Sequence, residues 1–419
     1  MLKVRGAPFT TFHSQVLYPW QCQRGLPPVG PVIGVDDLAG GTKFHYDPWE
    51  LYRRGLLTGA NMLVLGQIGK GKSAFIKTYV GRLVLTNDIR PFVVDPKREY
   101  GPFGELYGIP TLRLAPGGKG GRLNPLDAGP FGQEDGDSRV RQIELINALA
   151  ASGLERELTA GERAALGVIV EHVVMTARAQ GKVPTLPDVA DALFSPPVDA
   201  ARTLHTQSDQ LRDEVRQPAL AIQRLLRGDF AGMLDGPTSI PANWAERGLI
   251  VDLSAVYQSD ALAPVMLCAA TWLRQAASEQ PRPTLIVLDE AWAVLRLKSV
   301  TRWIQATAKL SRSFGVSLVL VVHRISDLES QGDAGSEAVR QAYGFLSDTE
   351  TRVLYAQPDS EADTIQRVLG LTDTEVETVL RLPPHKALWK VGAHAALVRH
   401  VLSPLEHQMV NTDQAMAKR

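Results

Sequence analysis

The chain has 419 residues, with 45 Lys and Arg against 45 Asp and Glu, and 44% of its residues are hydrophobic. This balance excludes a disordered polyelectrolyte and gives no overall basic surface for nucleic acid. The cysteines Cys22 and Cys268 form no CxxC pair, which argues against a disulfide framework or a zinc site. At this length we expect roughly two to three domain-sized units, or one large domain with an insertion.

No apolar run reaches the roughly 18–20 residues that a membrane-spanning helix needs. The first residues also lack the apolar segment of a secretory signal. We therefore expect a cytoplasmic chain. This composition is compatible with peripheral docking at the inner face of the cell membrane.

The elements expected from hydrophobic periodicity alternate along most of the chain. A Pro- and Gly-rich lead-in, irregular or forming an edge strand, is expected over residues 1–47. It is followed by strands at 61–65, 90–95 and 111–114, with a helix at 73–84 after the first of them. Residues 138–246 lack β-branched runs and show helical periodicity, with a capping box at Thr159 and Glu162. We expect an all-α insertion there.

Strand signals resume after the insertion. Strands are expected at 248–253, 284–289, 316–322, 352–355, 387–391 and 396–401, and helices at 261–277, 303–314, 336–343, 361–369 and 373–380. This alternation predicts an α/β fold with a mainly parallel sheet covered on both faces. The expected divisions are a lead-in at 1–47, an α/β core at 48–137 and 247–405, the all-α insertion at 138–246, and a tail at 406–419.

One motif is a phosphate-binding loop by its residues and by its context. Residues 66–73, GQIGKGKS, match GxxxxGK[ST] in full, between an expected strand and an expected helix. Glycines allow backbone N–H groups to curl around phosphates, and the helix directs its positive end at the same anion. Lys72 is expected to reach the β- and γ-phosphates, and the Ser73 hydroxyl to hold Mg²⁺. The predicted nucleotide-binding residues are Gly66, Gln67, Ile68, Gly69, Lys70, Gly71, Lys72, Ser73 and Ala74.

A second motif places two acids at the end of an apolar strand. In LIVLDEAW, Asp289 and Glu290 follow the strand expected at 284–289. Ligands of parallel sheets bind at the carboxyl ends of strands. Asp289 is therefore a candidate Mg²⁺ ligand, and Glu290 a candidate general base for the attacking water. The alternative interpretation is an acidic pair that caps a following helix.

Two further strand ends carry polar residues. His323 follows the strand at 316–322 and is a candidate γ-phosphate sensor, or alternatively a helix cap. Asp95 and Glu99, in DPKREY after the strand at 90–95, suit either a position beside the nucleotide or a solvated turn fixed by Pro96.

An arginine supplied by a neighbouring subunit assists hydrolysis in many ring ATPases. Arg312, just before the strand at 316–322, is the first candidate, with Arg302 and Arg324 as alternatives. Each suits equally well a surface arginine near a helix end. The aromatic residues Tyr46, Trp49 and Tyr52 suit core packing better than stacking on adenine.

The order of several motifs along the chain resembles that of a known family. These motifs are GQIGKGKS, VVDPKREY, LNPLD, the helical segment, IVLDEAW, LSRSFGVSLVLVVHRISDL and the late TRVLYAQ and LPPHKALWKVG blocks. It is similar to the motor domain of the VirB/TraC-type ATPases of type IV secretion and conjugation, within the HerA/FtsK group of RecA-like proteins. The resemblance runs from about residue 44 to residue 405.

The resemblance implies a RecA-like P-loop fold that hydrolyses ATP with Mg²⁺ in a ring, expected to be a hexamer, beside the membrane proteins of the apparatus. It assigns phosphate binding to Lys72, magnesium to Ser73 and Asp289, and water activation to Glu290. His323 stands where the family usually has glutamine. Only about 45 residues precede the motor, so the chain resembles a short form without the large N-terminal domain.

Three other functions fit parts of the sequence. A double-stranded DNA translocase of the HerA/FtsK type would share the fold, and arginines at 202, 212, 216, 224 and 227 would suit a pore. Interleaved Asp209, Asp213 and Glu214 favour a solvated helix face instead. A nucleotide-gated scaffold without catalysis is disfavoured by the intact Lys72 and Glu290. A nucleotide kinase is disfavoured by the length of the chain.

Overall fold

The structure is a computed structural model that describes residues 25–127, 136–227, 230–239, 244–257, 259, 262–278, 282–291, 315–328, 343–344, 346–347 and 349–410. The chain divides into two compact units. The first comprises Met1–Ile89 with Ala308–Arg419, and the second comprises Arg90–Thr307.

The first unit contains a mixed sheet in the strand order β2-β1-β11-β10-β9-β3-β8. Its strands are β1 (Val32–Asp36), β2 (Thr42–His45), β3 (Met62–Leu65), β8 (Val316–Val322), β9 (Thr351–Leu354), β10 (Lys386–Val391) and β11 (His394–His400). β3 pairs in parallel with β8 on one side and β9 on the other. The pairs from β9 through β10, β11 and β1 to β2 are antiparallel.

The second unit contains parallel strands in the order β7-β4-β6-β5. These are β4 (Arg90–Asp95), β5 (Thr111–Arg113), β6 (Leu249–Asp252) and β7 (Thr284–Leu288). The helix α11 (Leu262–Ser278) packs on β7 and β4. Every residue of β3, β4, β6, β7 and β8 is buried. Such continuous burial means that both faces of these strands are covered, as predicted for a parallel sheet.

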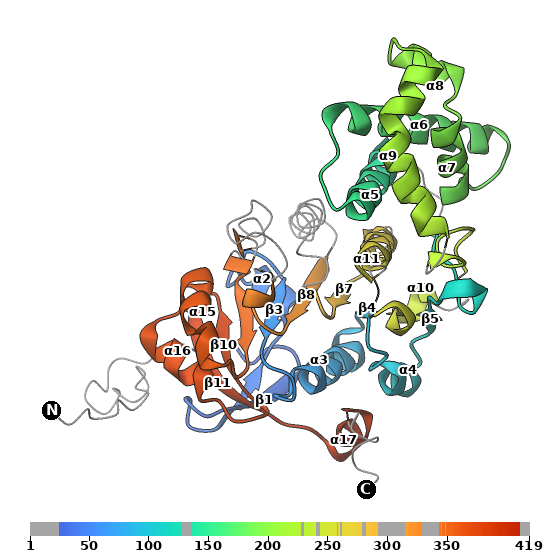
Figure 1. Cartoon of the computed structure of the whole chain (residues 1–419). Helices are drawn as coiled ribbons and strands as arrows, with labels where there is room; N and C mark the ends of the chain where they lie inside the picture. Colours follow the sequence, from blue (N-terminus) through green and yellow to red (C-terminus); the bar gives the residue numbers. More distant parts are fainter. Residues whose placement is uncertain are drawn as a thin grey trace, which may run out of the picture. The chain divides into compact units, whose positions relative to one another are not determined.

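Between β5 and β6, the second unit carries a group of helices (Figure 1). They are α5 (Gly136–Leu154), α6 (Ala160–Ala179), α7 (Leu186–Phe194), α8 (Val198–Thr203) and α9 (Ser208–Leu226), and α9 contacts the other four. The capping box predicted at the start of α6 is confirmed. The Thr159 hydroxyl accepts from the Glu162 N–H at 3.1 Å, and the Glu162 carboxylate accepts from the Thr159 N–H at 2.8 Å.

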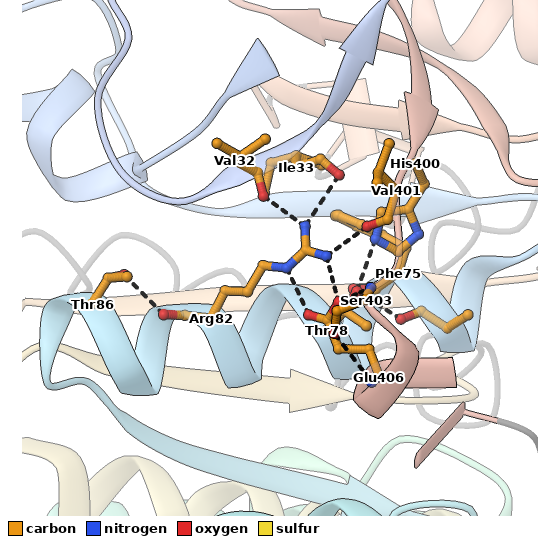
Figure 2. A network of polar contacts seen from close by, with 11 residues as sticks. Val32, Ile33, Phe75, Thr78, Arg82, Thr86, His400, Val401, Ser403 and Glu406 are labelled. Carbon is orange, nitrogen blue, oxygen red and sulfur yellow. Dashed lines mark hydrogen bonds and ion pairs between the residues drawn. The ribbon is translucent and has the colours of Figure 1, made fainter. Parts of the chain in front are cut away.

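In the first unit, α17 (Pro404–Val410) packs on α3 (Lys72–Asn87), the helix that follows the phosphate loop. Figure 2 shows the Arg82 guanidinium at the centre of this contact. Arg82 donates to both carboxylate oxygens of Glu406 at 2.7 Å and to the carbonyls of Val32 and Val401 at 2.6 Å. One side chain therefore ties α3 to β1, to the end of β11 and to α17.

Most elements expected from periodicity are present, and several have the predicted bounds. β4, β8 and α16 (Asp373–Leu380) match the prediction residue for residue, and α15 (Ala362–Leu369) starts one residue later. The expected lead-in contains an edge strand, β2, but the prediction is wrong for β1, which is an interior strand paired with both β2 and β11. The helix expected at 303–314 and most of the one expected at 336–343 lie outside the described residues. In the part of the chain that the structure describes, no helix combines the length and apolarity needed to span a bilayer.

Candidate functional site

The predicted phosphate loop begins at the carboxyl end of β3, in the first unit, and is fixed by the strands beside it. The Gly66 N–H donates to the Val322 carbonyl at 3.3 Å, and the Gln67 N–H donates to the Ala356 carbonyl at 3.0 Å. A Cβ at Gly66 would stand 2.4 Å from the Cβ of Tyr355. Only glycine permits this close approach between the loop and the chain that follows β9.

The loop leaves backbone donors open at the start of α3. Gly69 and Gly71 adopt φ of 76° and 107°, which are left-handed values that favour glycine. Gly71 is the N-cap of α3 and supplies no side-chain cap. Among the described residues, the N–H groups of Gly69, Gly71 and Ser73 have no hydrogen-bond acceptor. A helix N-terminus with open N–H groups is an anion-binding site.

Two side chains complete this cradle. Lys72 is 5% exposed, and its ammonium donates to the carbonyl of Gly66 and, at 2.9 Å, to that of Gln67. It therefore folds back over the loop. The half-buried Ser73 hydroxyl has no hydrogen-bond partner within the described residues. The donor set of N–H groups, an ammonium and a hydroxyl fits a polyphosphate with its cation.

Polar residues from β8 and β9 lie beside the loop. Leu65, the last residue of β3, pairs with Val322 of β8 and with Leu354 of β9. His323, next after Val322, therefore follows β8 at the edge where the loop follows β3, as predicted. The buried Gln357 amide donates to the His323 carbonyl at 3.2 Å.

The predicted acidic pair lies in the second unit, directly after β7. Asp289 and Glu290 are 6% and 2% exposed. The Asp289 N–H donates to the Val94 carbonyl at 3.4 Å, and the Glu290 N–H donates to the Asp289 carboxylate at 3.0 Å. Glu290 adopts φ of 55°, an uncommon left-handed value for a residue other than glycine. The pair is therefore held in a sharp buried turn.

Burial decides the protonation of Asp289. It raises the pKa of Asp289 to about 7, and the negative charges of Glu290, Glu99 and Asp95 act in the same direction. The Lys97 ammonium opposes the shift. A buried carboxylate among other acids gains most from a nearby divalent cation, so Asp289 fits the role of a magnesium ligand.

The DPKREY turn after β4 is an organised element rather than a solvated one. The Asp95 carboxylate, 1% exposed, accepts from the N–H groups of Lys97 at 3.2 Å, Glu99 at 3.1 Å and Tyr100 at 2.9 Å. The turn places the Lys97 ammonium in an ion pair with Glu290 and 5.4 Å from the ring centre of Tyr257. The residue that meets the acidic pair is thus Lys97.

The candidate arginines fall mostly beyond the described residues. Arg312 and Arg302 both lie there. Arg324 is described and exposed. Burial raises the pKa of Asp327, and the charge of Arg324 opposes this shift. On the helices, Arg202 pairs with Asp199 at 3.1 Å, and Arg212 pairs with Asp209 at 2.6 Å. These i,i+3 pairs suit the solvated helix face favoured from the sequence.

The aromatic residues considered for adenine stacking have other surroundings. Tyr46 is fully buried and donates to the Thr351 hydroxyl at 2.8 Å. The Trp49 indole donates to the Gly315 carbonyl at 2.9 Å. Both serve packing within the first unit, and Tyr52 is 40% exposed.

The comparisons with known proteins bear on the fold. No protein-family model and no curated protein matches the sequence. The structure is similar to VirB4 of Thermoanaerobacter pseudethanolicus, with a TM-score of 0.74 and 20% identity over 92% of this chain and 100% of that chain. The likeness establishes the fold.

The plasmid coupling protein TrwB gives further matches. Its complex with the ATP analogue ADPNP has a TM-score of 0.57 and 15% identity, covering 82% of this chain and 85% of that chain. Its complex with ADP and Mg²⁺ has a TM-score of 0.55 and 16% identity, covering 82% and 86%. The predicted α/β fold with a mainly parallel sheet is confirmed, and it is a fold that this chain shares with VirB4 and TrwB.

Sequence reasoning did not single out Lys97, Gln357 or His385. Lys97 meets the acidic pair, Gln357 fixes the backbone of His323, and His385 lies against the phosphate loop. For Lys97 a signal existed, since it stands in the DPKREY turn at a strand end. The other two come next to the loop only through strand pairing.

Proposed function

We propose that this chain is an ATP-hydrolysing motor of a type IV secretion or conjugative transfer system. The observation that carries the proposal is the set of open N–H groups at the start of α3, beside the ammonium of Lys72 and the hydroxyl of Ser73. The likeness to VirB4, and to TrwB complexes with an ATP analogue and with ADP and Mg²⁺, supports it.

The residues of the loop have binding roles. The N–H groups of Gly69 and Gly71 donate to phosphate oxygens, and the Lys72 ammonium turns from the loop carbonyls to the β- and γ-phosphates. The Ser73 hydroxyl would hold Mg²⁺ at the loop, and the Asp289 carboxylate is the proposed acidic ligand; the cation would offset the negative charge of the phosphates.

Glu290 acts on water. Its ionised carboxylate accepts a proton from the water that attacks the γ-phosphate, so a hydroxide-like oxygen forms only as the new bond forms. His323 donates a hydrogen bond to a phosphate oxygen, the role that a glutamine amide would also fill. Neither role needs a covalent intermediate on the protein.

Assembly into a ring would complete the motor. We infer that copies of this chain associate and that Arg312 of one copy stabilises the transition state in the next. The membrane proteins of the apparatus are the proposed docking partners. Sedimentation with and without ATP tests this, because ring formation predicts that the mass of the particle increases when nucleotide is added. Arg312→Ala should leave this increase in mass intact and lower the rate of ATP turnover.

The decisive experiment compares ATP hydrolysis and nucleotide binding by the wild type, Glu290→Gln and Lys72→Ala. Glu290→Gln should bind ATP normally and lose turnover by about 100-fold or more, because the base is missing while the cradle remains. Lys72→Ala should lose binding as well. Glu105→Gln, an exposed acid on α4 (Gly101–Tyr107), is the matched control. Equal turnover in Glu290→Gln and the wild type would contradict the assignment.

Adding double-stranded DNA at low and moderate salt separates the secretion motor from a DNA translocase. Strong stimulation that weakens with salt would favour the translocase, because phosphate contacts release counterions. A rate of ATP hydrolysis that does not change when DNA is added supports a motor that responds to protein partners.

A further inference from the structure

His385 is pinned against the phosphate loop from a distant part of the first unit. Its N–H donates to the carbonyl of Lys70 at 2.9 Å, and its own carbonyl accepts from the His400 N–H at 2.9 Å. The first bond joins it to the loop and the second to the end of β11. The backbone of His385 therefore moves with both elements.

The imidazole of His385 faces the glycine that starts α3. A Cβ built on Gly71 would lie 2.9 Å from Nδ1 of His385 and 3.3 Å from its Cα. The ring thus packs on the residue whose N–H group is one of the open donors. His385 is exposed, and among the described residues neither ring nitrogen has a hydrogen-bond partner. The ring therefore lies beside one of the residues whose N–H groups are open to an anion.

The backbone of His385 is in an uncommon conformation. Its φ is 63°, in the left-handed region that few residues other than glycine adopt, although histidine does so more often than most. Such backbone conformations cluster at functional sites. The two backbone hydrogen bonds hold it, so the turn presents a histidine where glycine would be easier to accommodate.

We propose that His385 is a nucleotide ligand, whose imidazole donates a hydrogen bond to a phosphate oxygen of the nucleotide bound at the same loop. This rests on the proposed ATP-binding function and adds a contact from outside the phosphate-loop motif. A neutral imidazole offers one N–H donor and an imidazolium offers two, so the contact is available in either form. The strand β10 begins at the next residue, so the sheet itself positions the ring.

The test uses the full chain with His385→Asn and His385→Gly, and with His407→Asn as the control. Asparagine and glycine both accept the left-handed backbone, so neither variant adds strain. His407 is an exposed histidine on α17. Titration calorimetry at pH 7 measures the Kd for ADP and, separately, for inorganic tripolyphosphate. We expect both Kd values to rise by about tenfold in the two His385 variants and to stay unchanged in His407→Asn.

Two results would overturn the proposal. Unchanged Kd values for both ligands would show that the ring makes no contact with them. A weaker Kd for ADP with an unchanged Kd for tripolyphosphate would place the contact on the base or ribose instead. Failure of the proposed function is distinguishable, because the wild type would then bind neither ligand. Circular dichroism of the variants verifies that the chain is folded.

Discussion

Lys97 and Glu290 form an ion pair across the carboxyl ends of the neighbouring strands β4 and β7. Burial lowers the pKa of Lys97, but its contacts with Glu290 and Tyr257 together raise it by more, so the ammonium stays protonated. Because the Glu290 carboxylate is only 2% exposed, it depends on this cation and on the turn that Asp95 organises.

Replacing Lys97 should therefore impair Glu290 without affecting nucleotide binding. We expect Lys97→Met to lower kcat by about tenfold, which corresponds to ~1.4 kcal/mol, with little change in KM. Lys97→Arg should restore most of the turnover, because it keeps a cation beside the carboxylate. Steady-state kinetics of the three proteins decide the matter. An undiminished kcat in Lys97→Met would mean that the ion pair does not support catalysis.

Gly71 should tolerate no side chain. In Gly71→Ala the new Cβ would overlap His385, and the φ of 107° is unfavourable for alanine. Fluorescence titration should show ATP affinity at least about tenfold weaker, because the loop must shift to relieve the overlap. Gly59→Ala is the control, since a Cβ there meets nothing within 4 Å. Similar affinities in the two variants would show that the loop adapts without cost.

The contact between α3 and α17 should contribute measurably to stability. Burial acts to raise the pKa of Glu406, but the hydrogen bonds from Arg82 and the Ser403 N–H outweigh it and leave the pKa below its ordinary value. Arg82→Met should therefore lower the free energy of unfolding by about 1–3 kcal/mol at pH 7. The pair's contribution is full above the unfolded-state pKa and is lost as the pH falls through the lower folded-state pKa.

Urea unfolding at pH 7 and pH 3 measures this effect. Arg53→Met serves as the control, because Arg53 pairs with Glu50 while its side chain is 71% exposed. Such surface pairs contribute about 0–1 kcal/mol. Equal losses of unfolding free energy in Arg82→Met and Arg53→Met at pH 7 would contradict this prediction. A difference between the two variants that is the same at pH 3 as at pH 7 would also contradict it.

His400 should make the first unit sensitive to mild acid. Burial, with the charges of Arg82 and His385, lowers the pKa of His400 to about 3 despite the opposing charge of Glu406. The unfolded chain takes up the proton near pH 6.5, so the folded state loses about 1.4 kcal/mol per pH unit between there and about pH 3.

Above pH 6.5 this penalty is absent, and the variant His400→Gln should remove it at all pH values. In the wild type, Nε2 of His400 lies 2.8 Å from the Thr78 hydroxyl (Figure 2). A glutamine amide at this position can make the same contact. Chemical denaturation between pH 5 and pH 8 should show a shallower pH dependence for the variant. Parallel curves for the two proteins would rule out His400 as the source.

Local signals in the sequence predicted the phosphate loop and several strands. The parts of the phosphate loop are contiguous in the sequence, because the strand, the glycines, the lysine and the start of the helix follow one another between Met62 and Asn87. The strands β4 and β8 were predicted with their bounds because each carries a short Val-rich apolar run, which is typical of strands that are buried on both faces. The interior position of β1 was not predicted, because the strand is short and its neighbours are rich in proline and glycine.

The sequence by itself determined which residues are candidates for phosphate and acid chemistry, because backbone freedom, helix polarity and side-chain charge are properties of short segments. Only the tertiary structure decided which distant residues meet them. Pairing of β9 with β3 carries Gln357 to the edge where the loop begins, and the bond from His385 to Lys70 carries the imidazole to Gly71. Strand partners are selected by packing across the whole sheet, so no local pattern records them.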